Sequence, residues 1–141
     1  MAEDLVVGAR YELTVDVDDR LVRRYGEAVG DFNPVHFDDG FASRTRFGRR
    51  IAHGGLLFGV ISRILGMHLP GPGTVFLGQT IEFKNPVFIP DRVTVSVELV
   101  ELTPRSGARL RVLVARGDDV IAVGEAVVKL PSWGIVQPLS S

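Results

Sequence analysis

The chain has 141 residues, the length of one ordinary domain, and we expect residues 1–141 to form a single domain. Its 16 lysines and arginines nearly balance 17 acidic residues, which disfavours a nucleic-acid partner, and the lack of cysteine excludes disulfides, thiolate metal sites and a cysteine nucleophile. The acidic first residues do not resemble a signal peptide and no apolar run approaches the ~20 residues of a membrane helix, so we expect a cytoplasmic protein without a membrane partner.

The first predicted elements are a strand and a helix. Residues 11–17 alternate loosely between apolar and polar side chains, which indicates a short strand. Asp18 or Asp19 can cap a following helix, because apolar side chains recur at helical spacing over residues 21–29. Gly30 is suited to end this helix, since glycine adopts the left-handed conformation that is common after a helix.

The segment after this helix is polar. Pro34 disfavours helical angles at Asn33, so residues 31–36 predict a turn or an extended bend. A short helix is expected over residues 41–43, because an aspartate shortly before them can cap it. Residues 44–50 are basic and predict a loop.

The most apolar segment of the chain predicts a long helix that begins at Gly54. Apolar residues occupy nearly every side of residues 56–67, so we expect this helix to be buried all round and wrapped by other elements. The Pro-Gly-Pro-Gly run at residues 70–73 ends it sharply.

The rest of the chain predicts an antiparallel sheet. Its segments alternate between apolar and polar residues, which is typical of strands with one dry face and one wet face. Turns at short intervals indicate a meander. An antiparallel sheet curled around one long apolar helix is the hot-dog architecture, an α+β fold. The expected strands are residues 81–84, 93–99, 108–112 and 120–130, with turns at 104–107 and 117–119.

The polar loop carries an acid and a base five positions apart, with a proline between them. Asp31 and His36 are both side chains that can act in general acid–base catalysis. The alternative is an ordinary surface turn, because Asp, Asn and Pro are common turn formers.

A second candidate is Gly54, at the start of the apolar helix. Backbone N–H groups there lack partners within the helix and can polarise a carbonyl, or the glycine can simply form a tight junction. His53 beside it can be a functional residue or a loop histidine without a role. Ser62 can orient a catalytic group or bond back to its own helix. His68 closes the helix and has no catalytic role in this interpretation.

No metal-binding or cofactor-binding motif is present, and the spacing of the three histidines does not fit a metal site. We therefore expect neither a metal ion nor a cofactor.

Several segments together resemble the MaoC-like dehydratases, and within them the short (R)-specific enoyl-CoA hydratases of polyhydroxyalkanoate synthesis. The similarity spans nearly the whole chain, and its first motif is the most specific. The segments that carry it are Gly-Asp-Phe-Asn-Pro-Val-His at 30–36 continuing to Ala-Ser at 42–43, Ile-Ala-His-Gly at 51–54, Leu-Pro-Gly-Pro-Gly at 69–73, Leu-Gly-Gln at 77–79, Phe-Lys-Asn-Pro-Val at 83–87 and residues 124–131.

This resemblance implies a hot-dog homodimer that interconverts trans-2-enoyl-CoA and (R)-3-hydroxyacyl-CoA. Asp31 and His36 match the acid–base positions of the family, and Gly54 matches the backbone N–H that binds the thioester carbonyl. Asn33 and Ser62 are expected to support the catalytic loop. The resemblance thus favours the catalytic interpretation of the loop over the surface turn.

The chemistry of hydration suggests separate roles for Asp31 and His36. Asp31 would take a proton from water while His36 supplies a proton at C2, and the reverse assignment stays open. Leu65 is expected to form a wall of the acyl pocket, so that alanine there extends the accepted chain length. A basic cluster can contact the phosphates of coenzyme A or form a solvated loop. Its members are Arg44, Arg46, Arg49 and Arg50.

Three other functions share this fold or its ligand. A hot-dog thioesterase would release free thiol, because fold alone does not decide function. A dehydratase could act on acyl carrier protein instead of coenzyme A. A non-catalytic subunit would bind acyl thioesters without turning them over. Chain-length preference, physiological direction and assembly beyond a dimer are not encoded in any motif found here.

Overall fold

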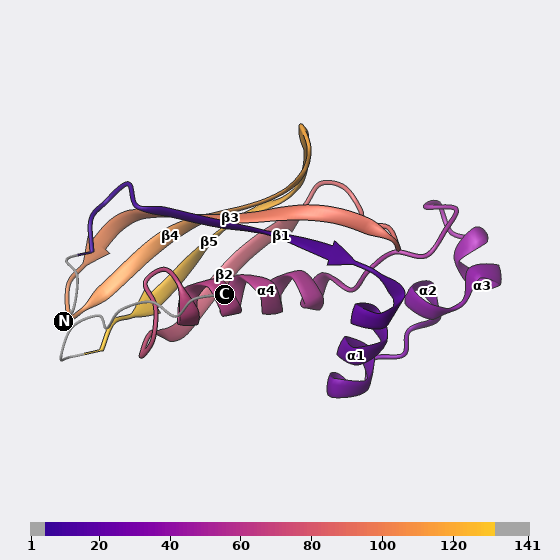
Figure 1. Ribbon diagram of the computed structural model, residues 1–141, viewed down its shortest axis with the longest axis horizontal. Helices are drawn as coiled ribbons and strands as arrows, with labels where there is room; N and C mark the ends of the chain where they lie inside the picture. Colours follow the sequence, from indigo (N-terminus) through magenta and orange to yellow (C-terminus); the bar gives the residue numbers. More distant parts are fainter. Residues whose placement is uncertain (1–4, 132–141) are drawn as a thin grey trace.

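The computed structural model describes residues 5–131, which form one antiparallel sheet and four helices. The sheet has the strand order β1-β3-β4-β5-β2. The long helix α4 lies against one face of the sheet, and the three shorter helices gather at the N-terminal end of α4 (Figure 1). The strands are β1 (Arg10–Val17), β2 (Val75–Phe83), β3 (Asp91–Thr103), β4 (Gly107–Arg116) and β5 (Asp119–Lys129).

Helix α1 (Asp19–Val29) forms as its capping residues predict. The Asp18 side chain accepts a hydrogen bond from the backbone amide three residues further on, which satisfies one of the free N–H groups of the first turn. Gly30 ends the helix in the left-handed conformation with φ of 76°. The carbonyl of Gly26 accepts hydrogen bonds from the amides of Gly30 and Asp31, so the end of α1 fixes the start of the next loop.

The loop after α1 is more helical than we expected. Asn33 has non-helical backbone angles, with ψ of 123°, as the following proline favours, but Pro34–Phe37 forms a one-turn helix, α2. The Asn33 side chain accepts a hydrogen bond from the amide of Val35, so Asn33 caps this turn. The short helix α3 (Asp39–Ser43) begins as predicted after an aspartate cap, and a loop follows it.

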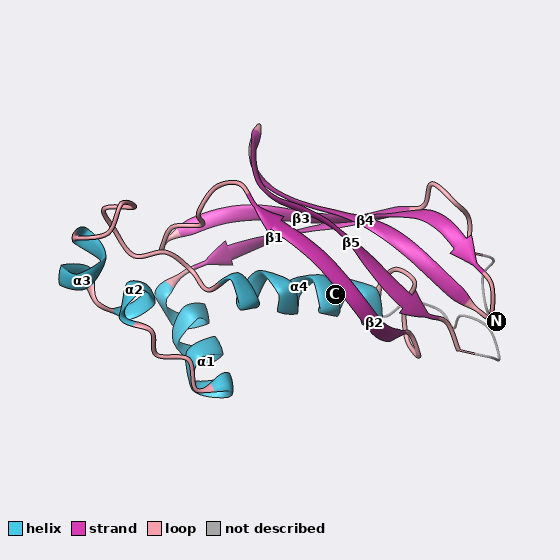
Figure 2. Cartoon of the chain, turned by 180° about the vertical axis from the view of Figure 1, so that it is seen from behind, coloured by secondary structure: helices cyan, strands magenta, loops and turns pink. Residues whose placement is uncertain are grey.

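Helix α4 (Gly54–Met67) has the predicted bounds, but our expectation that it is buried on all sides is wrong for this chain. One side packs into the core through Leu56, Leu57, Ile61, Ile64 and Leu65. The other side is open, as the views from both directions show (Figure 2). The Phe58 side chain, for example, is 40% exposed.

The sheet is only in part the meander that the sequence predicts. Strands β3, β4 and β5 follow one another as antiparallel neighbours. Strand β2 begins six residues before the predicted segment and pairs with β5, whereas β1 pairs with β3, so β1 and β2 form the two edges. The core lies between α4 and the inner face of the sheet, where Val95, Leu110 and Ile121 are fully buried. No helix within residues 5–131 is long and apolar enough to cross a membrane.

Candidate active site

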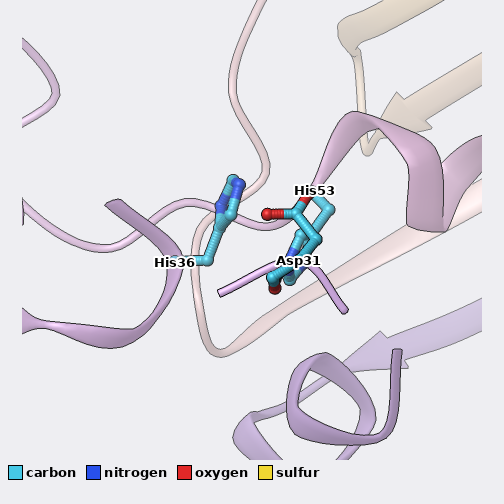
Figure 3. Close-up of side chains that lie close together, drawn as sticks. All are labelled: Asp31, His36 and His53. Atoms are coloured by element: carbon cyan, nitrogen blue, oxygen red, sulfur yellow. Dashed lines mark hydrogen bonds between the residues drawn. The ribbon is translucent and has the colours of Figure 1, made fainter. Parts of the chain in front are cut away.

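Three polar side chains meet where α1, α2 and α4 come together. They are Asp31 in the loop after α1, His36 in α2 and His53 at the N-cap of α4 (Figure 3). One ligand-type atom from each lies within 4.8 Å of the others. The rings of the two histidines are 3.8 Å apart between centroids and tilted by 31°. The structure therefore brings together the two predicted catalytic residues and a third residue whose role the sequence left undecided.

Asp31 is held mainly through its backbone. Its amide donates a hydrogen bond to the Gly26 carbonyl at 3.0 Å, and its own carbonyl accepts one from His53 Nε2 at 3.1 Å. The carboxylate accepts one hydrogen bond, at 3.2 Å from the amide of Asn33, and is half-buried. The carboxylate thus keeps capacity for a further hydrogen bond, for example from a water molecule.

His36 is buried, with 8% of its surface exposed. Its Nδ1–H donates a hydrogen bond of 2.6 Å to the carbonyl of Ile51, because a carbonyl can only accept. Nε2 then carries the lone pair of the neutral ring, and no residue in the range 5–131 forms a hydrogen bond to it. The His36 carbonyl accepts a hydrogen bond from Arg50, which is also paired with Asp19, so the backbone of α2 is anchored to α1.

Burial lowers the pKa of His36 below its ordinary value of 6.5. The hydrogen bond to Ile51 and the negative charge of Asp31 act in the opposite direction, while the charge interactions with His53 and Arg50 lower this pKa further. The ring is therefore neutral at pH 7, and Nε2 can accept a proton.

A cleft of about 270 Å³ opens beside His36 and reaches the first residue of α4. Gly54 lies in its wall, and a side chain at this position would collide with the ring of Phe83. His53 provides no side-chain cap for the helix, so its N-terminal amides keep their capacity to bind an acceptor. The rest of the lining is mostly apolar, with two cations: Phe47, Ile51, Ala52, Leu57, Phe83, Pro86 and Val87, together with Asn85, Arg46 and Lys84.

The four arginines of the basic loop have different surroundings. Arg46 lines the cleft. Arg50 is used in the fold, because it pairs with Asp19 and with the His36 carbonyl. Arg49 stacks on the ring of Phe88 at 3.9 Å, and Arg44 lies over a phenylalanine ring away from the cleft lining.

Two further predicted residues lie outside the cleft lining. Ser62 is half-buried and forms no side-chain hydrogen bond with the loop residues of the described range. Leu65 is 1% exposed and belongs to the core, two helical turns beyond Leu57, which does line the cleft. Their predicted roles remain predictions.

Sequence reasoning missed the contribution of Lys84, Phe83 and Leu57 to the cleft. Lys84 comes directly after β2, some forty positions from the basic loop, and no local pattern links these segments. Leu57 is one of many apolar residues on α4, and its place at the cleft follows only from where α4 meets the loop.

Asp31, His36 and His53 each offer one potential metal-ligand atom, and these atoms lie within 4.8 Å of one another. Each histidine uses one nitrogen on a backbone carbonyl. The other nitrogen of each ring has no hydrogen-bond partner among residues 5–131, and the two ring planes are tilted by 31°.

The fold is an α+β hot-dog domain in which Asp31, His36 and His53 cluster at the N-terminal tip of the long helix. The chain belongs to the MaoC-like domain family, whose model matches residues 3–122. This membership confirms the resemblance found in the sequence.

Curated relatives match nearly the whole chain. The 3-hydroxybutyryl-CoA dehydratase of Methylorubrum extorquens is 46% identical over 139 residues, covering 98% of this chain and 88% of the relative. The (R)-specific enoyl-CoA hydratase of Aeromonas caviae is 41% identical and covers 92% of this chain and 98% of the relative.

Solved structures agree with the fold. The (R)-hydratase from A. caviae involved in PHA biosynthesis superposes with a TM-score of 0.86 at 41% identity, covering 92% of this chain and 100% of its own. The R-hydratase PhaJ1 from Pseudomonas aeruginosa, in its unliganded form, gives 0.83 at 35% identity over 97% of this chain and 93% of its own. The hot-dog fold expected from the sequence is thereby confirmed.

Proposed function

We propose that this chain catalyses the reversible syn hydration of trans-2-enoyl-CoA to (R)-3-hydroxyacyl-CoA. The observation that carries the proposal is the neutral, buried His36, which shares a cleft with the first residue of α4 and lies beside the carboxylate of Asp31. The names of the relatives, an (R)-specific enoyl-CoA hydratase and a 3-hydroxybutyryl-CoA dehydratase, describe the two directions of this reaction and support the proposal.

Hydration requires a water molecule to attack C3 while a proton arrives at C2. In the proposed reaction, Asp31 and the Nε2 lone pair of His36 both accept hydrogen bonds from one water. His36 takes a proton as the C3–O bond forms, and the imidazolium then gives that proton to C2. Asp31 orients the water and stabilises the cationic ring. Since one residue pair serves one face of the alkene, addition is syn.

This assignment reverses the one that the sequence favoured. Sequence analysis made Asp31 the base and left the reverse open. The burial of His36 lowers its pKa, so the neutral form of the ring predominates. A neutral ring must accept a proton before it can donate one, which makes His36 the base in the first step. Positioned proton transfer of this kind typically accelerates a reaction by roughly 10²–10⁴-fold.

Attack at C3 moves negative charge onto the thioester oxygen. We propose that the amide of Gly54 donates a hydrogen bond to this oxygen, supported by the positive end of the α4 dipole. A fixed donor stabilises charge where it develops, and its loss costs about 3–4 kcal/mol in comparable sites. The close approach of Phe83 leaves no room for a side chain at Gly54 and adds an apolar wall beside this oxygen.

The positive charges at the cleft support coenzyme A as the carrier of the acyl group. Arg46 and Lys84 line it from two different segments and can contact the phosphates of coenzyme A. Phosphopantetheine of an acyl carrier protein offers fewer phosphates, so crotonyl-CoA and crotonyl-carrier protein should be compared directly. The lack of cysteine is compatible with a reducing compartment, and we include a cytoplasmic location in the proposal.

Two uncovered surfaces support a homodimer. Among the edge-strand positions of β2, Val75 and Leu77 are 56% and 60% exposed, whereas the exposed positions of the other edge, β1, are charged or polar. An edge strand with unpaired backbone groups and apolar side chains can pair with a strand of another chain. The open side of α4 continues from this edge, because Phe58 stacks on Phe76 of β2 at 5.0 Å.

The deciding experiment follows crotonyl-CoA by its conjugated-enoyl absorbance, by thiol release and by the configuration of the product. The wild-type protein should lose the absorbance without releasing thiol and form the (R)-alcohol. Asp31→Asn and His36→Gln should each lower kcat by roughly 10²–10⁴-fold and change KM far less. Asp39→Asn, an exposed acid in α3, is the matched control and should keep wild-type activity.

Each competing function has its own signature in the same assay. Released thiol would identify a thioesterase, and tight binding of crotonyl-CoA without turnover would identify a binding subunit. A near wild-type rate in either site variant would refute the acid–base pair.

A further inference from the structure

His53 is the most completely enclosed polar side chain near the site, with 2% of its surface exposed. Its ring lies 3.8 Å from that of His36 and contacts two further aromatic rings edge-on, Tyr25 of α1 at 4.8 Å and Phe37 of α2 at 5.5 Å. One side chain from the cap of α4 thus contacts both segments that frame the catalytic pair.

The hydrogen bond of His53 fixes which tautomer is present. Nε2 lies 3.1 Å from the carbonyl oxygen of Asp31, and since a carbonyl only accepts, Nε2 must carry the proton and donate it. Nδ1 is buried and has no hydrogen-bond partner among residues 5–131. A buried polar atom without a partner is uncommon in folded proteins and calls for a compensating role.

We propose that His53 is a positioning residue for the hydration: its Nε2–H fixes the backbone of Asp31 while its ring forms the surface on which His36 rests. The carboxylate and the imidazole are then held at a defined separation by one buried group. Because His53 directly precedes Gly54, the same residue relates the catalytic pair to the amide that binds the thioester oxygen. This inference rests on the proposed function and adds a residue to it.

Such positioning has a kinetic consequence. Proton transfer requires the reacting atoms to lie within a few tenths of an ångström of their productive places, and a displacement of about 1 Å can cost up to 10²-fold in rate. Asp31 is bound to the rest of the protein by few contacts of its side chain, so the bond from His53 to its carbonyl is a principal restraint on it.

His53 also affects the titration of His36. The charge interaction with His53 lowers the pKa of His36, an effect that follows burial and the bond to Ile51 in size. Replacing His53 by an uncharged residue should therefore raise the pKa of His36 toward 6.5. The other charged groups that face His36 stay in place in such a variant: Asp31 in the loop, Arg50 beneath α2, and Arg46 and Lys84 in the cleft.

Two substitutions separate the effect of the N–H donor of His53 from the effect of its ring. His53→Phe keeps an aromatic surface under His36 but removes the hydrogen bond to Asp31. It should lower kcat by roughly tenfold to a hundredfold, leave KM within about twofold, and move the acid limb of kcat/KM to higher pH. His53→Gln offers an N–H donor again without a chargeable ring. It should recover at least part of the lost kcat and still show the shifted acid limb.

His68→Phe is the matched control. His68 is buried to a similar degree, with 5% exposed, stacks on Tyr11 at 4.2 Å and also has a nitrogen without a partner among the described residues. It lies at the far end of α4, about 20 Å from His53 along the helix. This variant can lose thermal stability, but its kcat and acid limb should match the wild type.

The inference is overturned if folded His53→Phe retains the wild-type kcat and acid limb, or if His68→Phe shows the same kinetic losses. If His53→Phe does not fold, His53→Gln decides, because an unshifted acid limb in it contradicts the proposal. NMR titration of the His36 ring gives the same pKa comparison without turnover. It therefore tests His53 even if crotonyl-CoA proves not to be a substrate, a result that would instead refute the proposed function.

Discussion

Burial decides the chemical state of His36. One nitrogen donates to the Ile51 carbonyl, the other is left for chemistry, and removal from water disfavours the charged ring. An exposed histidine with the same neighbours in sequence would be partly protonated near neutral pH. The packing of α2 against the residues before α4 therefore gives His36 the neutral ring that the proposed mechanism requires.

The first prediction concerns pH. Because the proposed mechanism requires neutral His36, kcat/KM should decline as the pH falls through the lowered pKa of this residue, that is, below 6.5. The same shift affects the free energy of unfolding, because His36 binds a proton at about 6.5 in the unfolded chain and only at lower pH in the folded chain. The contribution of His36 to stability is therefore fully present above pH 6.5 and is lost as the pH falls through its lowered pKa. Kinetics and thermal unfolding between pH 4.5 and 8 check both statements. An acid limb above 6.5 would contradict them.

The second prediction concerns the two cations that line the cleft. Arg46→Ala and Lys84→Ala should each raise KM for crotonyl-CoA by roughly two- to fivefold with little change in kcat, as expected for partly exposed charge contacts. Added salt should raise the wild-type KM more than that of the double variant, because salt screens these contacts. Arg44→Ala, outside the lining, serves as the control. If all three substitutions raised KM equally, the positive charge of the whole region, and not contacts in the cleft, would account for the effect.

At the scale of the element, α4 combines two functions. Its first turn presents Gly54 to the cleft, and its buried side continues the apolar wall away from the site. Leu57 and Leu65 lie on this side eight residues apart, which corresponds to about 12 Å along the helix. An acyl chain that follows α4 would meet Leu57 first and Leu65 only when it is longer.

The third prediction uses this order. Leu57→Ala should improve the kcat/KM of short and medium enoyl-CoA substrates relative to crotonyl-CoA. Leu65→Ala should extend the accepted range toward longer chains, at the cost of about 2–5 kcal/mol of stability because it opens a cavity in the core. Activities on a series of enoyl-CoA chain lengths, together with unfolding midpoints, test this pair. An unchanged profile in Leu65→Ala would remove Leu65 from the wall and leave it a core residue.

At the scale of the molecule, apolar side chains of a single chain stay exposed along β2, at Val75 and Leu77, and on the outer side of α4, at Phe58. Most soluble assemblies are symmetric, and a two-fold partner would place β2 beside the β2 of a second copy. A stable interface of this kind buries roughly 1,200–2,000 Å². The sequence expectation of a helix buried all round would then hold for the assembly, although it fails for one chain.

The fourth prediction tests this assembly. Leu77→Lys places a charge on the exposed apolar edge and should convert a dimer to a monomer in light scattering coupled to size exclusion. Val120→Lys, at an exposed position of the β4–β5 hairpin, is the control and should leave the mass unchanged. A wild-type protein that is monomeric at micromolar concentration would refute the homodimer.

The sequence alone was sufficient for features that depend on neighbouring residues. The cap at Asp18, the left-handed end at Gly30 and the bounds of α4 follow from interactions within a few positions, which any short window of sequence contains. The sequence also singled out Asp31 and His36, which share one loop and one family motif and lie close together in the structure; their catalytic role stays a prediction.

The tertiary structure alone decided which distant segments meet. Three features depend on packing between segments far apart in the chain: the one-sided burial of α4, the edge positions of β1 and β2, and the presence of Arg46 and Lys84 in one cleft. The same is true of His53, which contacts Asp31 across twenty-two positions. The spacing of side chains in the sequence predicts which face of an element is buried, but not which other element packs against that face. These contacts, and the lowered pKa that burial gives His36, are therefore seen only in the folded chain.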